Sequence, residues 1–211
     1  MIGVLGGSFD PIHFGHINPL YELSDIFEFD QIRLVPTYNS AVNKTFNASA
    51  NHRFNMVSLI SSSETNNFVA DNAEIVKQNT SYTYETIKII KKQQNRDDIC
   101  LIVGLDVFLN IETWYNYMEI LKDTNIVVIN RPGYDIEKIN NMSFEILERI
   151  TSDKIDFIKN EKKQIFIHKS PSIKISSSQI RDVIKSGNKP LGLIPGAILT
   201  YIKRNNLYTG K

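Results

Sequence analysis

The chain has 211 residues, 42% of them hydrophobic, and 24 basic against 23 acidic residues leave a formal net charge of +1. This balance does not favour long nucleic acid as a partner, because such binding usually needs a clear basic excess. No apolar run approaches the ~20 residues that span a membrane, and the N-terminus lacks a signal peptide, so we expect a cytoplasmic protein. The single cysteine, Cys100, excludes an internal disulfide, and its apolar surroundings predict a buried thiol.

In the first half of the chain, short apolar runs alternate with segments of helical periodicity. Strands are expected at residues 2–5, 32–35, 68–70 and 99–103. Helices are expected at residues 17–29, 52–60 and 83–92. Residues 37–50 are polar and rich in asparagine, which indicates a long loop of the kind that often carries function.

The second half continues the alternation, with a partly helical, aromatic-rich segment at residues 109–121. Strands are expected at 125–129 and 164–168, and helices at 137–150, 179–185 and 197–205. This order predicts a Rossmann-like α/β fold, a parallel sheet with helices on both faces. We expect one domain over residues 1–211, with a helical C-terminal portion from about residue 176. Ligands of such sheets bind outside the carboxyl ends of the strands, so the residues after each strand are the candidates.

The segment from Gly6 to His16, Gly-Gly-Ser-Phe-Asp-Pro-Ile-His-Phe-Gly-His, follows the first expected strand and opens a helix. The two glycines let the backbone approach phosphate oxygens, and a helix N-terminus favours anions. Because His13 lies three residues before His16, both rings can face one ligand. A polyphosphate site is predicted, while an ordinary turn and a zinc site on two histidines are the alternatives. The P-loop and dinucleotide-binding patterns are both absent.

A second candidate lies near the C-terminus, where the segment from Ile175 to Arg181 reads Ile-Ser-Ser-Ser-Gln-Ile-Arg. Serine is a preferred N-cap, and Arg181 would lie about one turn into the helix that follows. An arginine beside exposed helix amides suits a diphosphate, although a segment of this kind on its own is more often a plain helix cap.

Both segments resemble signatures of the nucleotidyltransferase superfamily, Gly-x-Phe-Asp-Pro-x-His-x-Gly-His and Ile-Ser-Ser-Thr-x-Ile-Arg, with Ser178 replacing the threonine. The resemblance is narrower still, because further segments occur in the order found in bacterial nicotinate-nucleotide adenylyltransferases. These are residues 81–83, 104–106, 113–115 and 131–134, and the C-terminal pairs at 201–202 and 207–208. The similarity covers nearly the whole chain.

The resemblance implies transfer of AMP from ATP to nicotinate mononucleotide, giving nicotinate adenine dinucleotide and pyrophosphate in NAD biosynthesis. The acceptor phosphate would attack the α-phosphorus directly, so the protein must align two anions and neutralise charge. The residues with an implied catalytic role are His13, His16 and Arg181. Those implied in ATP binding are Gly6, Gly7, Ser8, Phe9, His13, His16, Gly104, Asp106, Ile175, Ser177, Ser178 and Arg181. Mg²⁺ would enter with ATP, since no dedicated carboxylate cage is evident and no protein metal ligand is assigned.

The acceptor side of the implied site is less firmly defined by the sequence. The residues implied in acceptor binding are Lys44, Thr83, Tyr84, Trp114, Tyr115 and Arg131. The family usually carries Pro-Pro-His-Lys or Pro-Pro-His-Arg after the second strand, whereas Ser-Ala-Val-Asn stands here at residues 40–43, one step before Lys44. Plainer interpretations stay open: a helix N-cap for Asp106, core packing for the aromatic pair, and solvated side chains for Lys44 and Arg131.

Two other functions are also compatible with the sequence. One is an adenylyltransferase of the same fold with another acceptor, such as nicotinamide mononucleotide or phosphopantetheine. The other is a nucleotide sensor without catalysis, although such a sensor would have no need to keep His13, His16 and Arg181. No feature of the sequence indicates an oligomeric state.

Overall fold

The computed structural model describes residues 1–41, 45–62, 67–130, 133–169 and 174–210, and its centre is one seven-stranded sheet. All strand pairs of this sheet are parallel, as the alternation of strands and helices predicted. In spatial order the strands are β4 (Phe68–Ala70), β2 (Gln31–Pro36), β1 (Ile2–Gly7), β6 (Ile99–Gly104), β7 (Asn125–Ile129), β9 (Ile165–His168) and β8 (Ile150–Thr151). A separate two-stranded sheet pairs β3 (Asn39–Ser40) with β5 (Thr80–Ser81).

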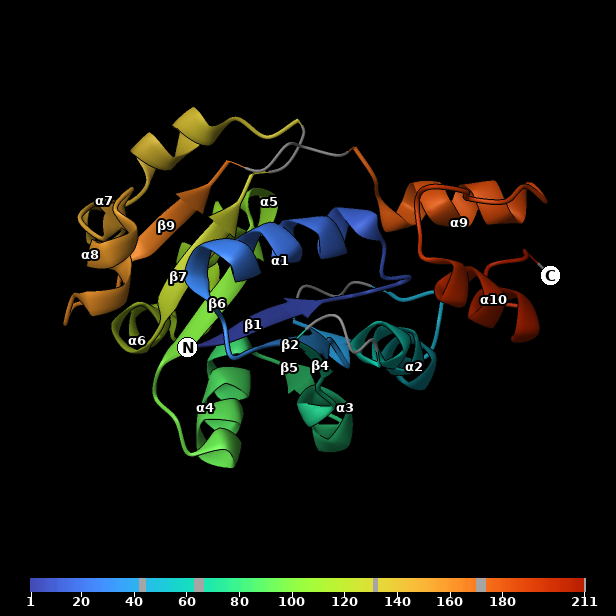
Figure 1. The fold of residues 1–211 in the computed structure, drawn as a ribbon, viewed down its shortest axis with the longest axis horizontal. Helices are drawn as coiled ribbons and strands as arrows, with labels where there is room; N and C mark the ends of the chain where they lie inside the picture. The colour runs from blue at the N-terminus through green and yellow to red at the C-terminus, as the bar shows by residue number, and fades with distance from the viewer. Residues whose placement is uncertain (42–44, 63–66, 131–132, 170–173, 211) are drawn as a thin grey trace.

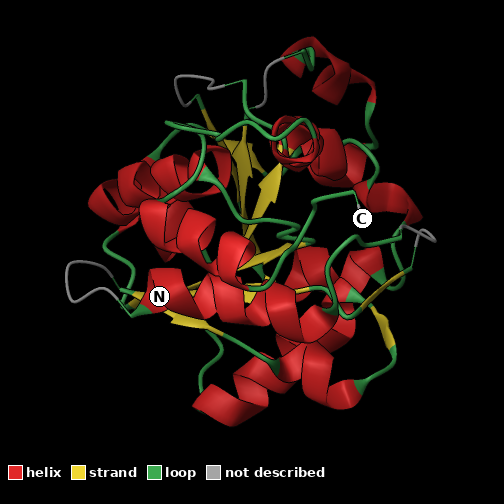
Figure 2. Ribbon diagram, turned by 90° about the vertical axis from the view of Figure 1, so that its right-hand side faces the viewer, coloured by secondary structure: helices red, strands yellow, loops and turns green. Residues whose placement is uncertain are grey.

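Helices cover both faces of the large sheet (Figure 1 and Figure 2). One face is packed by α1 (Phe14–Phe27), α2 (Ala50–Ser61), α8 (Lys154–Lys159), α9 (Ser177–Lys185) and α10 (Gly196–Arg204). The other is packed by α4 (Thr83–Gln94), α5 (Leu105–Phe108), α6 (Tyr117–Asp123), α7 (Phe144–Leu147), and the 3-10 helices η1 (Ile111–Thr113) and η2 (Ile136–Asn141). The short helix α3 (Ala73–Lys77) contacts β2 and α4. This arrangement confirms the predicted Rossmann-like class.

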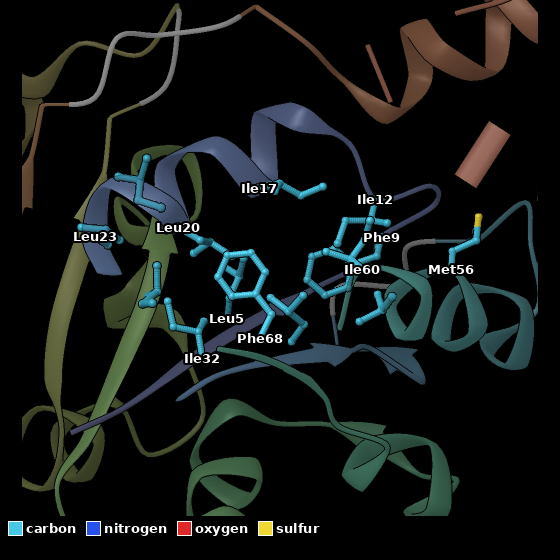
Figure 3. Close-up of a cluster of buried hydrophobic side chains, with 14 of the residues drawn as sticks. Leu5, Phe9, Ile12, Ile17, Leu20, Leu23, Ile32, Met56, Ile60 and Phe68 are labelled. Carbon is cyan, nitrogen blue, oxygen red and sulfur yellow. The ribbon is translucent and has the colours of Figure 1, made fainter. Parts of the chain in front are cut away.

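The strands are almost continuously apolar because both faces of the sheet are buried. In β1, Val4 belongs to one core cluster and Leu5 to the other, as the two-residue period of a strand requires. Figure 3 shows Leu5 and the neighbouring strand residue Ile32 in one cluster with Leu20 of α1. Both faces of the sheet therefore contribute a hydrophobic core to stability.

Helix α1 begins directly after His13, three residues earlier than its apolar pattern predicted, and ends at Phe27. Its buried residues recur at helical spacing and face the sheet: Ile17, Pro19, Leu20, Leu23 and Phe27. Because β1 ends at Gly7, the N-terminus of α1 lies one short loop beyond the carboxyl end of the strand. The backbone here has the strand–turn–helix form that the anion-site prediction requires.

One predicted helix is wrong. Residues 137–150 form η2 and then α7, and the chain enters β8 at Ile150 instead of continuing as a helix. The backbone amide of Ser143 donates to Glu112 Oε1 at 3.0 Å, and Ser143 is the N-cap of α7, so the helical path restarts there. The parallel pairing of Ile150 with Ile165 of β9 then favours a strand. A tertiary partner thus overrides the helical spacing.

The other expected strands and helices are found, with ends shifted by a few residues. Six of the described elements were not predicted, namely α3, α5, α8, β3, β5 and β8, and none is longer than six residues, which is too short for a periodic pattern. Cys100 is fully buried and burial raises the pKa of its thiol, which confirms the predicted structural cysteine. In the described part of the chain, no helix has the length and apolar character that crossing a membrane requires.

Candidate active site

The strand order of the sheet changes direction between β1 and β6. These strands are neighbours, yet the chain leaves β1 toward β2 on one side and leaves β6 toward β7 on the other. Ile2 pairs with Ile99, and the register continues to Leu5 and Ile102, so Gly7 and Gly104 end the two strands at the same level. This is the topological switch point at which open parallel sheets bind ligands.

The two histidines of the first loop lie together at the start of α1. The backbone amide of His13 donates to Nδ1 of His16 at 3.3 Å, and the ring centroids are 3.7 Å apart. His13 is buried, whereas His16 is partly exposed. Because Nδ1 of His16 accepts a hydrogen bond, the proton of its neutral ring must sit on Nε2. His16 can therefore present an N–H donor on the side opposite to the backbone.

The backbone of this loop is shaped around the histidine pair. A Cβ added to Gly15 would lie 3.0 Å from Nδ1 of His13, so a larger residue here would press on the ring of His13. Phe9 adopts a left-handed φ of 47°, its ring is buried in the core, and its edge meets the ring of His16. Figure 3 shows Phe9 beside Ile12 of the same loop. The Phe9 side chain thus supports His16 from the core, and only its backbone remains for the predicted contact with ATP.

Gly6 and Gly7 differ in what surrounds them. A Cβ on Gly6 would meet nothing within 4 Å, whereas one on Gly7 would lie 3.0 Å from the ring of Phe9. The space beside Gly6 is therefore open, whereas the space beside Gly7 is limited by the ring of Phe9. Ser8 follows, and its carbonyl accepts a hydrogen bond from the buried guanidinium of Arg53 at 2.8 Å.

The second motif docks directly on the first loop. Ser176 is the N-cap of α9, as the serine-rich pattern predicted, and its hydroxyl accepts from the amide of Gln179. Ser177 donates from Oγ to the carbonyl of Pro11 at 3.0 Å. Arg181 donates from Nη1 to the carbonyl of Asp10 at 2.7 Å. The two segments lie more than 160 residues apart in the sequence, yet they form one continuous surface.

Other predicted residues of the second motif complete this surface. Ser178 is exposed, and its hydroxyl lies 3.1 Å from that of Ser176 at the open end of α9. The carbonyl of Ile175 lies 3.4 Å from the position of a Cβ on Gly15, so this residue packs against the first loop. In Figure 1, α9 lies beside the first turn of α1. The predicted histidines, serines and arginine are thereby brought together at one end of the sheet.

Asp10 is the centre of the loop, although no role was predicted for its side chain. Its carboxylate is buried and accepts from the amides of Asn47 at 2.7 Å and Ala48 at 3.0 Å. It also accepts from the Tyr208 hydroxyl at 2.8 Å. Arg181 Nη1 lies 3.8 Å from the same carboxylate. One buried charge thus connects the first loop, the segment before α2, α9 and the C-terminal tail.

Gly104 and Asp106 lie where β6 ends. Gly104 is the N-cap of α5, and Asp106 is the second residue of that short helix, partly exposed at its first turn. The alternative of a helix N-cap for Asp106 is therefore wrong, since Gly104 holds that position. A carboxylate in the first turn of a helix beside the crevice is suited to accept hydrogen bonds from a sugar.

The predicted acceptor residues lie at the start of α4. Thr83 and Tyr84 are its first two residues, so their amides have no carbonyl four residues earlier within the helix. Tyr115 is 52% exposed, and its ring centroid lies 5.0 Å from that of Tyr82 and 6.1 Å from that of Tyr84. Trp114 is partly buried and packs against the core, at the end of η1. Tyr115 is therefore the exposed member of the predicted aromatic pair.

A chain of hydrogen bonds connects the acceptor segment to the first loop. Arg53 is buried, and besides the Ser8 carbonyl it reaches the carbonyl of Tyr38 at 3.5 Å. The amide of Tyr38 donates to Ser81 Oγ at 3.2 Å, two residues before Thr83. Burial lowers the pKa of the Arg53 guanidinium, and the Asp10 carboxylate opposes this effect. Arg53 lies within a predicted helix, and no local sequence pattern indicates that it forms this bridge.

Known proteins match this chain over almost its full length. The cytidylyltransferase-like family matches residues 4–183, which include both anion-site motifs. A probable nicotinate-nucleotide adenylyltransferase of Methylococcus capsulatus is 30% identical, with 99% of each chain covered. One of Pseudomonas syringae pv. tomato is 32% identical, covering 98% of this chain and 93% of its own. The chain belongs to the nicotinate-nucleotide adenylyltransferase family.

Solved structures agree with this assignment at the level of the fold. A Plasmodium falciparum nicotinic acid mononucleotide adenylyltransferase complexed with NaAD superimposes with a TM-score of 0.73 at 20% identity, covering 98% of this chain and 96% of its own. A putative nicotinate-nucleotide adenylyltransferase from Vibrio parahaemolyticus gives a TM-score of 0.64 at 16% identity, covering 100% of this chain and 96% of its own. The resemblance drawn from the sequence motifs is confirmed.

Two predicted acceptor residues of this adenylyltransferase family member, Lys44 and Arg131, lie outside the described residues. The unusual loop at residues 40–43 is described only in part, and Ser40 there belongs to β3. In the described part of the chain, no group of three or more histidine, cysteine or carboxylate side chains is arranged to hold a metal ion. The zinc alternative for His13 and His16 therefore has no third protein ligand among these residues.

Proposed function

We propose that the protein transfers AMP from ATP to nicotinate mononucleotide, giving nicotinate adenine dinucleotide and pyrophosphate. Membership of the adenylyltransferase family supports the reaction. The observation that supports the site is the docking of Arg181 and Ser177 on the carbonyls of Asp10 and Pro11. This contact brings two anion-binding helix starts, those of α1 and α9, to one crevice, and an ATP polyphosphate needs donors on two sides.

The proposed reaction is a direct displacement. A phosphate oxygen of the acceptor attacks the α-phosphorus of ATP, the new P–O bond forms, and the bond to the β,γ-diphosphate breaks. The attacking phosphate is already ionised, so the protein supplies no base. His16 donates from Nε2 to the α-phosphate as its charge grows, and His13 supports the phosphate chain. Ser178 and Arg181 hold the leaving pyrophosphate.

The remaining ATP contacts follow the crevice. The backbone of Gly6, Gly7, Ser8 and Phe9 approaches the phosphates, and the segment at Gly104 with Asp106 accepts hydrogen bonds from the ribose. Ile175 supports the first loop through its carbonyl. Mg²⁺ enters bound to the phosphates of ATP as part of the substrate, consistent with its preference for substrate phosphates over all-protein cages.

The acceptor occupies the other side of the switch point in this proposal. Its nicotinate carboxylate lies on the first amides of α4, at Thr83 and Tyr84, where a helix N-terminus favours negative charge. The pyridine ring stacks on Tyr115, with Trp114 beneath it. Charged side chains for the acceptor phosphate are supplied by Lys44 and Arg131.

We further propose that residues 1–211 act as one domain in the cytoplasm. The last helices return to the first loop, since Arg181 and Tyr208 both contact Asp10. A site divided between the two ends of the chain requires both ends to fold together. A cytoplasmic location is where ATP and a mononucleotide acceptor are both available.

Pyrophosphate release tests the proposal. The purified protein is incubated with MgATP and with nicotinate mononucleotide, nicotinamide mononucleotide or phosphopantetheine in turn, and the adenylylated product is identified by chromatography. We expect equimolar pyrophosphate and nicotinate adenine dinucleotide, with slower turnover for the amide. Turnover with phosphopantetheine instead would change the acceptor. ATP binding without turnover on any acceptor would indicate a nucleotide sensor and overturn the proposal.

A further inference from the structure

The C-terminal tail is attached to the first loop through one hydroxyl. Tyr208 donates to Oδ1 of Asp10 at 2.8 Å, across 198 positions of sequence. Burial raises the pKa of the Tyr208 hydroxyl, and the neighbouring Asp10 carboxylate adds to this effect. The hydroxyl therefore stays protonated and acts as the donor in this contact.

The tail is fixed on its own side as well. The amide of Leu207 donates to the carbonyl of Ile202 at 3.0 Å, and both Leu207 and Tyr208 pack against the core cluster beneath α1. Tyr208 adopts a left-handed φ of 64°, an uncommon conformation for a bulky residue. Such backbone geometry persists only where the surroundings hold it in place.

Asp10 carries this contact to the second anion site. Its carboxylate meets Tyr208, and its main-chain carbonyl accepts the 2.7 Å hydrogen bond from Arg181 Nη1. Tyr208 and Arg181 also share the wall of a cavity of about 250 Å³. The cavity is lined by Asn47, Arg181, Asp182, Lys185, Tyr208 and Gly210. The tail and the Arg181 guanidinium therefore contact the same residue, Asp10, so a displacement of the tail should also displace the guanidinium.

We propose that Tyr208 is a positioning residue for the diphosphate site, acting through Asp10 on Arg181. This inference rests on the proposed function, in which Arg181 holds the leaving pyrophosphate. The Tyr208 hydroxyl fixes the Asp10 side chain and hence the carbonyl that holds one edge of the guanidinium. The remaining N–H groups of Arg181 are then aimed at the anion without further loss of side-chain freedom on binding.

Tyr208→Phe tests the inference by removing only the oxygen atom. Asp10 keeps its contacts with Asn47 and Ala48, so we expect the variant to fold. Binding of inorganic pyrophosphate with Mg²⁺ is measured by calorimetry, and KM values are measured for ATP and for the acceptor. We expect pyrophosphate binding and the KM for ATP to worsen about fivefold, while the KM for the acceptor changes less than twofold.

Tyr201→Phe is the matched control. Its hydroxyl lies 2.9 Å from both Asn55 Nδ2 and His52 Nδ1, a contact that connects α10 to α2 and involves neither Asp10 nor Arg181. The control variant should lose a little thermal stability and keep the pyrophosphate affinity of the natural protein. A Tyr208→Phe variant that behaves in the same way would show that the tail is only a structural support, and would overturn the inference.

A double-variant cycle tests the route through Arg181. If Tyr208 acts by positioning the guanidinium, Tyr208→Phe should have little further effect on pyrophosphate binding in an Arg181→Lys background. Equal weakening in both backgrounds would contradict the proposed route. Calorimetry requires no turnover, so it separates the two proposals. Absence of pyrophosphate and ATP binding by the natural protein would contradict the proposed function, and the inference with it.

Discussion

The backbone amide of His13 donates to Nδ1 of His16 across 3.3 Å, and this single contact determines which ring nitrogen of His16 can serve a ligand. With Nδ1 occupied as an acceptor, the ring proton of a neutral imidazole lies on Nε2. The ring is also held from the core by the edge of Phe9, 5.3 Å away between centroids. A donor fixed in direction before the substrate arrives is what stabilisation of a charged transition state requires.

His16→Ala should therefore lower the rate far more than it affects the fold. Loss of one preorganised donor costs about 3 kcal/mol of transition-state stabilisation, a drop in kcat of roughly 10²–10³. His52→Ala is the control, because His52 contacts Tyr201 and takes no part in the phosphate site. Steady-state kinetics measure kcat for both variants. A kcat of His16→Ala within about threefold of that of the natural protein would remove His16 from the mechanism.

Arg181→Lys should not be tolerated at the second anion site. The guanidinium uses one N–H group to bind the Asp10 carbonyl and has further N–H groups for the diphosphate. A lysine ammonium cannot reproduce this planar, two-sided set of donors. We expect a loss of about tenfold or more in kcat/KM for ATP, since a hydrogen bond to a charged group contributes roughly 1.5–3 kcal/mol.

The control for this variant is Arg96→Lys. Arg96 forms a two-point contact with the carboxylate of Asp98, and it lies before the amino end of β6. Its replacement should leave the KM for ATP unchanged. Normal ATP kinetics in Arg181→Lys would mean that the second anion site has been assigned to the wrong residue.

Glu74 gives the protein a defined dependence of stability on pH. Burial raises the pKa of this carboxyl, while hydrogen bonds from Ser81 and Thr86 oppose the shift. The folded protein thus holds this proton more tightly than the unfolded chain does. The bound proton of Glu74 therefore stabilises the folded protein fully below the ordinary glutamate pKa, and this stabilisation is lost as pH rises through the raised pKa. Glu74→Gln, whose amide oxygen can still accept from Thr86, does not titrate at this position. Its free energy of unfolding should therefore rise relative to that of the natural protein as pH increases above the ordinary glutamate pKa.

Urea unfolding at a series of pH values measures this difference, and Glu148→Gln supplies a control of opposite sign. Lys162 lowers the pKa of the Glu148 carboxyl, so its small contribution is present at neutral pH and is lost as pH falls. A constant difference in stability between Glu74→Gln and the natural protein across the range would contradict a raised pKa for Glu74.

The sequence was sufficient for six of the seven strands of the large sheet and for the residues of the two motifs that meet at its edge, because both leave local patterns. Apolar runs marked the strands, and the two motifs contained His13, His16, Ser177 and Arg181 at recognisable spacing. The contacts that hold these residues carry no such pattern. Asp10 meets Tyr208 across 198 positions, and pairing of that kind follows only from the path of the whole chain.

The same reason explains the failures of the sequence analysis. The predicted helix at residues 137–150 is interrupted by a contact of Ser143 with a distant glutamate and by a strand partner, neither of which is local. From the sequence, Arg53 is only one polar residue of a predicted helix, although in the structure it is buried and connects the carbonyls of Ser8 and Tyr38. Long-range polar contacts thus decide which of the locally plausible structures forms.

Acceptor choice follows from the chemistry of the α4 N-terminus. Nicotinate carries a carboxylate where nicotinamide carries a neutral amide. If the amides of Thr83 and Tyr84 receive that group, both can donate to a carboxylate, whereas the NH₂ of nicotinamide would face one of them and leave it poorly paired. A mispaired buried donor costs about 1–3 kcal/mol. We therefore expect the acid to be preferred by at least ~10-fold in kcat/KM.

Variants of two kinds separate this effect from general acceptor binding. Tyr115→Ala should weaken acid and amide by a similar factor, because stacking does not depend on the ring substituent, and Tyr115 is exposed enough for the fold to tolerate the change. Arg131→Ala should also weaken both, since the 5′-phosphate is common to them. The acid-to-amide ratio should thus stay constant while both rates fall. Equal use of acid and amide by the natural protein would reject a carboxylate pocket at α4, and residues 40–44 would then be the next segment to vary in search of the acceptor determinant.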